Sequence, residues 1–170
     1  MPPKSKTDPQ IIQMPPQKMA VVKGKGPPEK VFAELMPALY GSVFTLKFDL
    51  KKKGLPTFKV SGLRARYPNI LKEKKNEWTH LIGLPVPDDT VSLPQKVAGV
   101  AVKLETWTYG TVGQILHLGT YAGEEANINR LHEFISDNGY EISGPHEEEY
   151  LTRPDAKVPK TIIRYEIKKK

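Results

Sequence analysis

Apolar residues recur at helical spacing over one long stretch in the first half of the chain. The apolar side chains at intervals of three or four are Val31, Phe32, Leu35, Leu39, Val43 and Leu46. The stretch follows a GKGPPE turn, whose prolines suit the start of a helix. Lysines and a glycine at 51–54 suit its end. The pattern predicts a helix to about Phe48, kinked at Pro37 because proline lacks the backbone donor.

A second helix is predicted after the GTYAGEE segment at 119–125. Its core-facing side chains have the same spacing and are Ile128, Leu131, Phe134 and Ile135. Asn138 and Gly139 end it, because this dipeptide readily adopts the left-handed conformation that closes helices.

Short apolar or alternating runs between turn residues predict strands. The predicted strands are 18–23, 58–67, 78–84, 99–107, 112–118, 147–151 and 161–167. Because a TYGTVG turn separates the strands at 99–107 and 112–118, we expect these two to pair.

The two halves of the chain have the same order of elements. In each half a strand ends at a glycine turn, a helix follows, and two further strands come after the helix. This order indicates an internal duplication. It predicts an α+β domain with two strand-helix-strand-strand modules, antiparallel sheets and a central cleft. The expected limits are a flexible tail or loosely docked arm at 1–14, a first repeat at about 15–87, a linker at 88–98 and a second repeat at about 99–167.

Composition narrows the class of protein. The chain has 170 residues and no cysteine, which excludes disulfides and thiolate metal sites. Its apolar runs are shorter than the roughly 18 residues of a membrane span, and its start lacks the apolar core of a signal peptide. We therefore expect a cytoplasmic protein.

Charge is unevenly distributed along the chain. Residues 1–75 contain 16 Lys and Arg against 5 Asp and Glu, whereas residues 76–170 contain 10 against 14. Such asymmetry can mark a half that binds nucleic acid, or a lysine-rich surface in water. The basic half has few aromatic residues and no helix-turn-helix, zinc or single-strand-binding signature, which favours the solvated surface.

Three consecutive acids stand in the predicted strand of GPHEEEYL, residues 144–151. Glutamate is depleted in strands, so this run needs an explanation. Side chains alternate along a strand, which places Glu148 and Tyr150 on one face and Glu147 and Glu149 on the other. The alternative is that all three acids are surface charges that protect an edge strand from aggregation.

Several motifs together resemble the GyrI-like small-molecule-binding domain family. HLGTY at 117–121, NG at 138–139, HEEEYL at 146–151 and TIIRYEI at 161–167 follow the family order. ALYGSVFTLKF at 38–48, NEWTHLIGLPVP at 76–87 and VKLETWTYG at 102–110 resemble its longer, stand-alone branch. The resemblance covers about residues 15–167 and implies two strand-helix-strand-strand repeats around a central cleft.

The resemblance also implies a site. Glu148 and Tyr150 match the acid and the tyrosine of the family pattern, so they are expected to face the cleft, with Glu147 and Glu149 facing solvent. A carboxylate in an apolar cleft can attract a lipophilic cation or act as a general base on water. Similar stand-alone members hydrolyse cyclopropane-containing electrophiles, a reaction in which Tyr150 could orient water or donate a proton.

Further ligand-binding candidates are Trp78, Tyr121 and Trp107 as aromatic walls, with Tyr165 and Tyr67 as weaker ones. Each could instead be ordinary core. His117 matches the family histidine, but its place in a strand just before a glycine turn favours a structural role, with a hydrogen bond across that turn. His80 and His146 have no metal-site spacing, and no cofactor is expected.

The chain departs from the family pattern at several positions. GLRA at 62–65 replaces paired tryptophans, His80 replaces an aromatic residue, and Thr120 replaces proline. Arg64 could therefore give the cleft a cation and favour a polar or anionic ligand. Three readings remain: a module that captures apolar or cationic small molecules, a hydrolase using Glu148 and Tyr150, and a protein- or nucleic-acid-binding module. The oligomeric state is left open.

Overall fold

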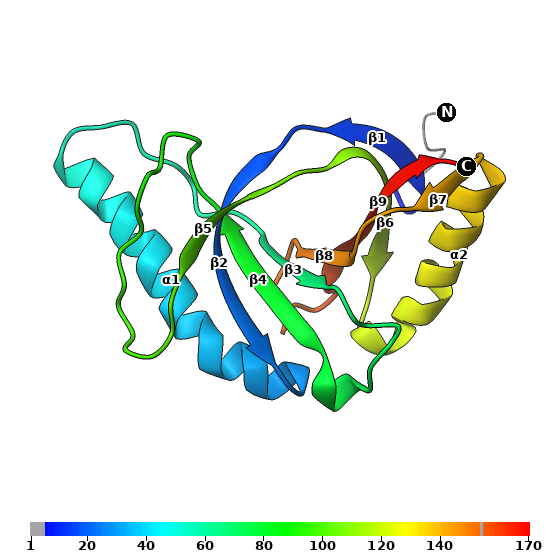
Figure 1. Cartoon of the computed structure of the whole chain (residues 1–170), viewed down its shortest axis with the longest axis horizontal. Helices are drawn as coiled ribbons and strands as arrows, with labels where there is room; N and C mark the ends of the chain where they lie inside the picture. Colours follow the sequence, from blue (N-terminus) through cyan, green and yellow to red (C-terminus); the bar gives the residue numbers. More distant parts are fainter. Residues whose placement is uncertain (1–5, 154) are drawn as a thin grey trace. The chain divides into compact units, whose positions relative to one another are not determined.

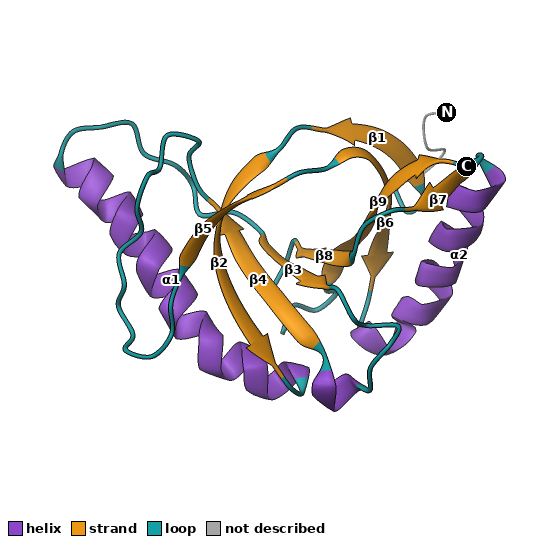
Figure 2. Cartoon of the chain, viewed as in Figure 1, coloured by secondary structure: helices purple, strands orange, loops and turns teal. Residues whose placement is uncertain are grey.

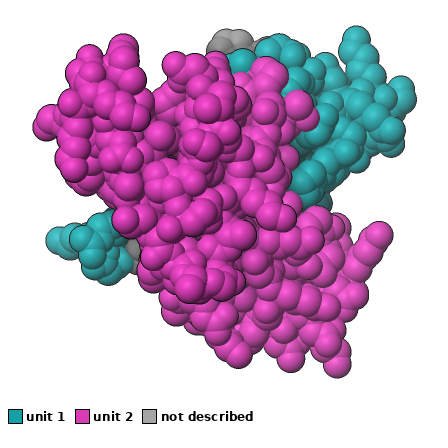
Figure 3. Space-filling model, turned by 60° about the vertical axis from the view of Figure 1, so that its left-hand side comes forward, with its two compact units in different colours: residues 1–15, 109–170 teal, residues 16–108 magenta. Residues whose placement is uncertain are grey.

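The computed structural model describes residues 6–153 and 155–170. They form two compact units, coloured separately in Figure 3. Unit 1 comprises Met1–Pro15 and Tyr109–Lys170, and unit 2 comprises Pro16–Thr108. Each unit has an antiparallel sheet and one long helix, as Figures 1 and 2 show. The fold is therefore of the α+β class, as the sequence predicts.

Unit 2 contains the first strand-helix-strand-strand repeat. Its elements are β2 (Gln17–Lys25), α1 (Pro28–Lys52), β3 (Leu63–Tyr67), the short 3₁₀ helix η1 (Lys75–Glu77), β4 (Thr79–Pro85) and β5 (Lys103–Trp107). Strand β4 pairs with β3 on one side and with β2 on the other, and β2 also pairs with β5. Helix α1 packs against β2 and β4 of this sheet.

Unit 1 contains the second repeat and one strand from the start of the chain. Its elements are β1 (Gln10–Met14), β6 (Gly110–Leu118), the 3₁₀ helix η2 (Tyr121–Gly123), α2 (Glu124–Asp137), β7 (Tyr140–Ile142), β8 (His146–Tyr150) and β9 (Lys160–Lys169). The paired order is β1, β6, β9 and β8, and β7 pairs with β9. Helix α2 packs against β6 and β7.

The pairing confirms the internal duplication and corrects one expected hairpin. In both units the last strand of the repeat lies between the two others, giving β3, β4, β2 and β8, β9, β6. The sequence predicts that strands β5 and β6 pair with each other. Instead, β5 pairs with β2, and β6 lies between β1 and β9. Each repeat thus has a fourth strand beside its own first strand, β5 beside β2 and β1 beside β6. A prediction that pairs only strands adjacent in sequence misses this arrangement.

The N-terminal segment differs in part from the expected tail. Gln10–Met14 form β1, which pairs with β6 from Gln10 opposite Gln114 to Met14 opposite Gly110. A flexible tail is therefore wrong for these five residues, because their backbone groups complete the edge of a sheet. Residues 1–5, also part of the expected tail, lie outside the described residues.

Two predicted strands are shorter in the structure. The strand expected at 58–67 is paired only over Leu63–Tyr67, and the one expected at 99–107 only over Lys103–Trp107. Ahead of the latter, the Gln95 side chain accepts from the Val102 amide at 2.9 Å and donates to its carbonyl at 2.8 Å. The Gln95 side chain thus takes the place of a neighbouring strand as the hydrogen-bond partner of the Val102 backbone.

Both ends of α1 follow the sequence signals. Pro28 is its first residue, and the chain turns after Lys53 with Gly54 at a positive φ of 68°. The Leu55 amide donates to the Leu50 carbonyl and the Gly54 amide to the Lys51 carbonyl, which satisfies carbonyls of the last turn. Pro37 lies inside the helix, which continues on both sides of it and is not split there.

Close helix–sheet packing defines the core of unit 1. Its buried cluster comprises Ile115, Leu131, Ile135, Ile163, Tyr165 and Ile167. Gly113 in β6 permits the close approach of α2, because a Cβ at this position would lie 2.8 Å from Cγ1 of Ile135. No helix within the described ranges is both long and apolar enough to cross a membrane.

Candidate functional site

The acidic strand β8 has buried acids on both of its faces. Glu147 is opposite Arg164 in the pairing with β9, and Glu148 is opposite Ile163. Glu147 is 2% exposed and Glu148 is 6% exposed. Glu148 is buried, and that it faces a cleft stays a prediction. The expectation that Glu147 faces solvent is wrong, and Glu149 is half-buried.

An arginine explains why Glu147 is buried and Glu149 half-buried. The guanidinium of Arg164 donates to Glu147 at 2.8 Å and to Glu149 at 3.1 Å. It also donates through Nε to Gln114 at 2.9 Å, and the Tyr109 hydroxyl donates to the other Glu147 oxygen at 3.0 Å. Charges can be buried when they are paired and hydrogen-bonded, so the contacts of Arg164 account for the burial of this polar network.

Glu148 lies on the face of the sheet that α2 covers. Its cross-strand neighbour Ile163 is part of the core that α2 covers. The carboxyl of Glu124, the first residue of α2, lies near that of Glu148, whose charge acts on it. Burial raises the pKa of Glu148 above its usual value. Burial and the charge of Glu148 raise the pKa of Glu124 to about 8.

A histidine and a tyrosine continue the polar cluster beyond Glu148. His146 Nε2 lies 3.4 Å from a Glu148 oxygen, and its Nδ1 accepts a hydrogen bond from the Tyr165 hydroxyl at 2.6 Å. Burial lowers the pKa of His146 to about 4, so the ring is neutral at pH 7. His132 of α2 packs edge-on against Tyr165, with ring centroids 5.0 Å apart. The cluster therefore contains acids and neutral rings.

Two tyrosines lie at the outer side of the acid pair. Tyr121 of η2 and Tyr150 at the end of β8 are in edge-to-face contact, with ring centroids 6.1 Å apart. Tyr121 is 48% exposed, yet burial and the charges of Glu148 and Glu124 raise its pKa. Tyr121 is thus close to the carboxyls and open to solvent, which suits an aromatic wall.

His117 makes the hydrogen bond across the turn that the sequence suggests. Asn127 donates to its Nδ1 at 2.8 Å, so Nε2 carries the proton and donates to the Thr120 carbonyl at 2.8 Å. The ring is buried. His117 holds the β6–η2 turn, and so helps to position Tyr121 and Glu124.

The other expected ligand residues belong to unit 2. Trp78 packs edge-on against Tyr67 and donates to the Glu73 carbonyl at 3.0 Å. Trp107 is 2% exposed, and the guanidinium of Arg66 lies 4.3 Å from its ring centroid. Arg64 is in β3. That Trp78, Trp107 and Arg64 share a site with Glu148 stays a prediction.

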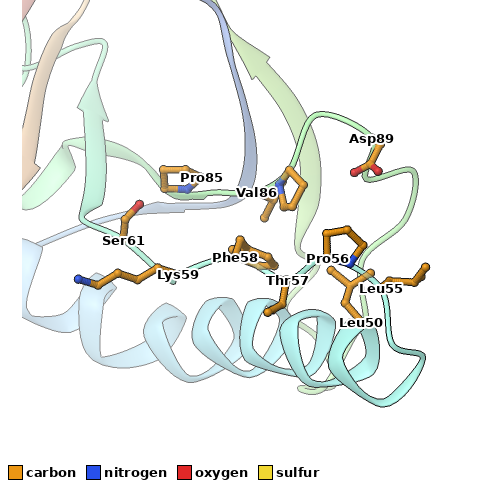
Figure 4. A pocket seen from close by; sticks show the side chains of 11 residues that line it. Leu50, Leu55, Pro56, Thr57, Phe58, Lys59, Ser61, Pro85, Val86 and Asp89 are labelled. Carbon is orange, nitrogen blue, oxygen red and sulfur yellow. The ribbon is translucent and has the colours of Figure 1, made fainter.

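A separate cavity of about 450 Å³ lies in unit 2. The end of α1, the segment 55–61 and the residues around the end of β4 form its wall, and Figure 4 shows Phe58 beside Pro85 and Val86. It contains none of the residues that the sequence singles out as site candidates. No cluster suited to a metal ion is found in the part of the chain that the structure describes.

Sequence reasoning missed two members of the site region. Glu124 stands beside Glu125 in the first turn of α2, where acids simply favour the helix dipole, so nothing distinguishes it as buried. Arg164 lies in a correctly predicted strand, and its position opposite Glu147 becomes apparent only from the register.

Comparisons with solved structures give the same fold. An uncharacterized conserved protein from Listeria innocua matches with a TM-score of 0.85 and 22% identity, covering 97% of this chain and 94% of that one. A hydrolase from Listeria innocua matches with a TM-score of 0.79 and 21% identity, covering 96% and 93%. The C-terminal domain of EcmrR matches with a TM-score of 0.66 and 15% identity, covering 96% and 98%. No curated protein sequence matches significantly.

Fold and site define a duplicated α+β protein with a buried acidic cluster beneath one helix. The family model of the GyrI-like small molecule binding domain matches residues 7–168, almost the whole chain. The chain belongs to this family.

Proposed function

We propose that the protein captures apolar compounds carrying a positive charge, and that Glu148 is their anionic partner. The observation that carries this is the Oε1 atom of Glu148, which is buried and has no hydrogen-bond partner among the described residues. A buried carboxylate oxygen without a partner is costly. A bound cation would supply the missing interaction.

The surroundings of Glu148 support a cation rather than an anion. Arg164, the buried cation of unit 1, donates to Glu147 and Glu149 on the other face of the sheet. The groups whose charges act on the Glu148–Glu124 pair are two histidines, one of them with a lowered pKa. The tyrosine faces at positions 121 and 150 can add cation–π attraction of about 0.5–2 kcal/mol.

The test is calorimetric titration with tetraphenylphosphonium, a lipophilic cation. Glu148→Gln removes the charge at nearly constant volume and should weaken binding at least tenfold, or about 1.4 kcal/mol. Glu125→Gln is the matched control, because Glu125 is exposed in the same helical turn. Equal affinities for the wild type and Glu148→Gln would refute the proposal.

A second candidate is hydrolysis of cyclopropane-containing electrophiles. It is favoured by the raised pKa of Glu148, which makes its carboxylate a stronger base, and by Tyr150 on the same face of β8. In this reaction Glu148 takes a proton from water as the water oxygen bonds to a ring carbon. The ring C–C bond breaks, and Tyr150 donates a proton to the carbon that keeps the electron pair.

Mass spectrometry distinguishes turnover from binding. A hydrolase would convert such a compound to a ring-opened product that is heavier by one water, and Glu148→Gln would abolish the conversion. An unchanged rate in Glu148→Gln would exclude Glu148 as the base. Binding without any product leaves capture as the function.

A further inference from the structure

Glu124 is a buried acid at the start of a helix, where an exposed acid would interact equally well with the helix dipole. It is the first residue of α2 and 9% exposed, whereas its neighbour Glu125 is exposed. Its carboxyl lies near that of Glu148 in β8, and the charge of Glu148 acts on it. The Oε1 atoms of both side chains are buried and lack a partner among the described residues.

Two neighbouring carboxyls can bond to each other only when one of them carries a proton. An ionised carboxylate can only accept, so two ionised groups cannot bond to each other, whereas one protonated group can donate to the other. Two carboxylates in one buried site also repel, which favours one neutral member. The arrangement thus describes a pair with a single negative charge.

Among the described residues, histidines and tyrosines surround the pair. The titratable groups that act on it are His117 from β6, His146 from β8, Tyr165 from β9 and Tyr121 from η2. His117 accepts a hydrogen bond from Asn127 through Nδ1, and burial lowers the pKa of His146 to about 4. Burial raises the pKa of both tyrosines, which also stay neutral.

We propose that Glu124 and Glu148 share one proton in the ligand-free protein and that a bound cation displaces it. The step balances: a pair with one negative charge takes up one positive charge and releases one proton to water. The buried site therefore keeps the same net charge before and after binding. The displacement rests on the proposed function, whereas the shared proton does not.

Two measurements test the two parts. Calorimetry with tetraphenylphosphonium in buffers of different ionisation enthalpy gives the number of protons released. About one proton per cation is expected at pH 7, with affinity rising about tenfold per pH unit below the pKa of the pair. Carbon-13 NMR measures the titration of the glutamate carboxyls in the ligand-free protein. A shared proton predicts that one carboxyl titrates above pH 7.

Two variants provide the comparison. Glu124→Gln should still bind the cation, because the introduced amide can donate to the Glu148 carboxylate and favour its ionised form. Its proton release and the slope of affinity with pH should therefore fall toward zero. The carboxyl titrating above pH 7 should be lost as well. Glu125→Gln, altered one residue away, should behave as the wild type in every respect.

The outcomes separate the two proposals. Binding without proton release in the wild type would overturn the displacement and leave the proposed function standing. Absence of binding would overturn both the proposed function and the displacement. Carboxyls that all titrate below pH 5 would overturn the shared proton, whatever the binding result.

Discussion

Glu147 and Glu148 are consecutive in β8, and their carboxyl groups are buried on opposite faces of one sheet. Glu147 is neutralised by Arg164, its cross-strand neighbour. Glu148 meets another acid, Glu124. Glu147 thus belongs to a polar network, whereas the Oε1 atom of Glu148 is buried without a hydrogen-bond partner among the described residues.

Arg164 is expected to be important for stability. Arg164→Met leaves Glu147 and Glu149 without their cation, and breaking a buried pair in this way typically costs about 3–5 kcal/mol of unfolding free energy. Urea denaturation measures this. Lys168→Met is the control, because Lys168 pairs with Glu141 at the surface and should contribute at most about 1 kcal/mol. Similar losses in the two variants would contradict the role of Arg164.

Stability should fall as pH rises above neutrality. The folded protein holds a proton on Glu124 up to about pH 8, whereas an unfolded glutamate loses it near pH 4.5, so unfolding releases a proton within this window. His146, with its pKa lowered from 6.5 to about 4, acts in the opposite sense, but only below pH 6.5. From pH 6.5 to 8, the folded state binds one proton more than the unfolded state, so the free energy of unfolding should fall by about 1.4 kcal/mol per pH unit.

Denaturation midpoints measured from pH 6.5 to 8.5 test this dependence. Glu124→Gln should show a clearly smaller decline than the wild type, and Glu125→Gln the same decline. A wild-type protein whose stability is constant or rises over this range would show that Glu124 is already ionised at neutral pH.

The close approach of α2 to β6 should be sensitive to a single methyl group. In Gly113→Ala the new Cβ would lie 2.8 Å from Cγ1 of Ile135, and overpacking of this kind costs about 1–3 kcal/mol. Gly41→Ala within α1 should instead stabilise by up to about 1 kcal/mol, because alanine favours helices and the nearest atom is Lys96 Cβ at 3.4 Å. Thermal denaturation gives both values, and equal signs would contradict the packing.

Much of the fold follows from the sequence, because it depends on local patterns. Helix α2 ends with its C-cap at Asn138 and with Gly139 at a positive φ of 84°, as the Asn-Gly pair indicates. The partners of β5 and β1 could not be predicted, because β5 pairs with β2 and β1 pairs with β6, strands that are distant in sequence. Strand β7, only three residues long, gives no periodic signal.

The site was predictable only in part. Alternation separates Glu148 from Glu147 and Glu149, but it cannot tell what covers each face, so the burial of Glu147 was missed. The partner of each acid depends on tertiary contacts, with Arg164 set by the β8–β9 register and Glu124 by the packing of α2.

Tyr121 should contribute to binding and not to folding. It is 48% exposed and packs against Tyr150 near the acid pair. Tyr121→Ala should weaken tetraphenylphosphonium binding several-fold, consistent with a cation–π contribution of about 0.5–2 kcal/mol, and should leave the unfolding free energy nearly unchanged. Tyr121→Phe keeps the ring and should bind as the wild type. Weakening by Tyr121→Phe equal to that by Tyr121→Ala would assign the effect to the hydroxyl.

The charge of the ligand tests the central claim most directly. Tetraphenylphosphonium and tetraphenylborate have nearly the same shape and opposite charge, so equilibrium dialysis of both against the wild-type protein isolates the electrostatic part of binding. The buried Glu148 predicts saturable binding of the cation, with one bound per chain, and at least tenfold weaker binding of the anion. Equal binding of the two ions, or preference for the anion, would contradict an acidic small-molecule site at Glu148.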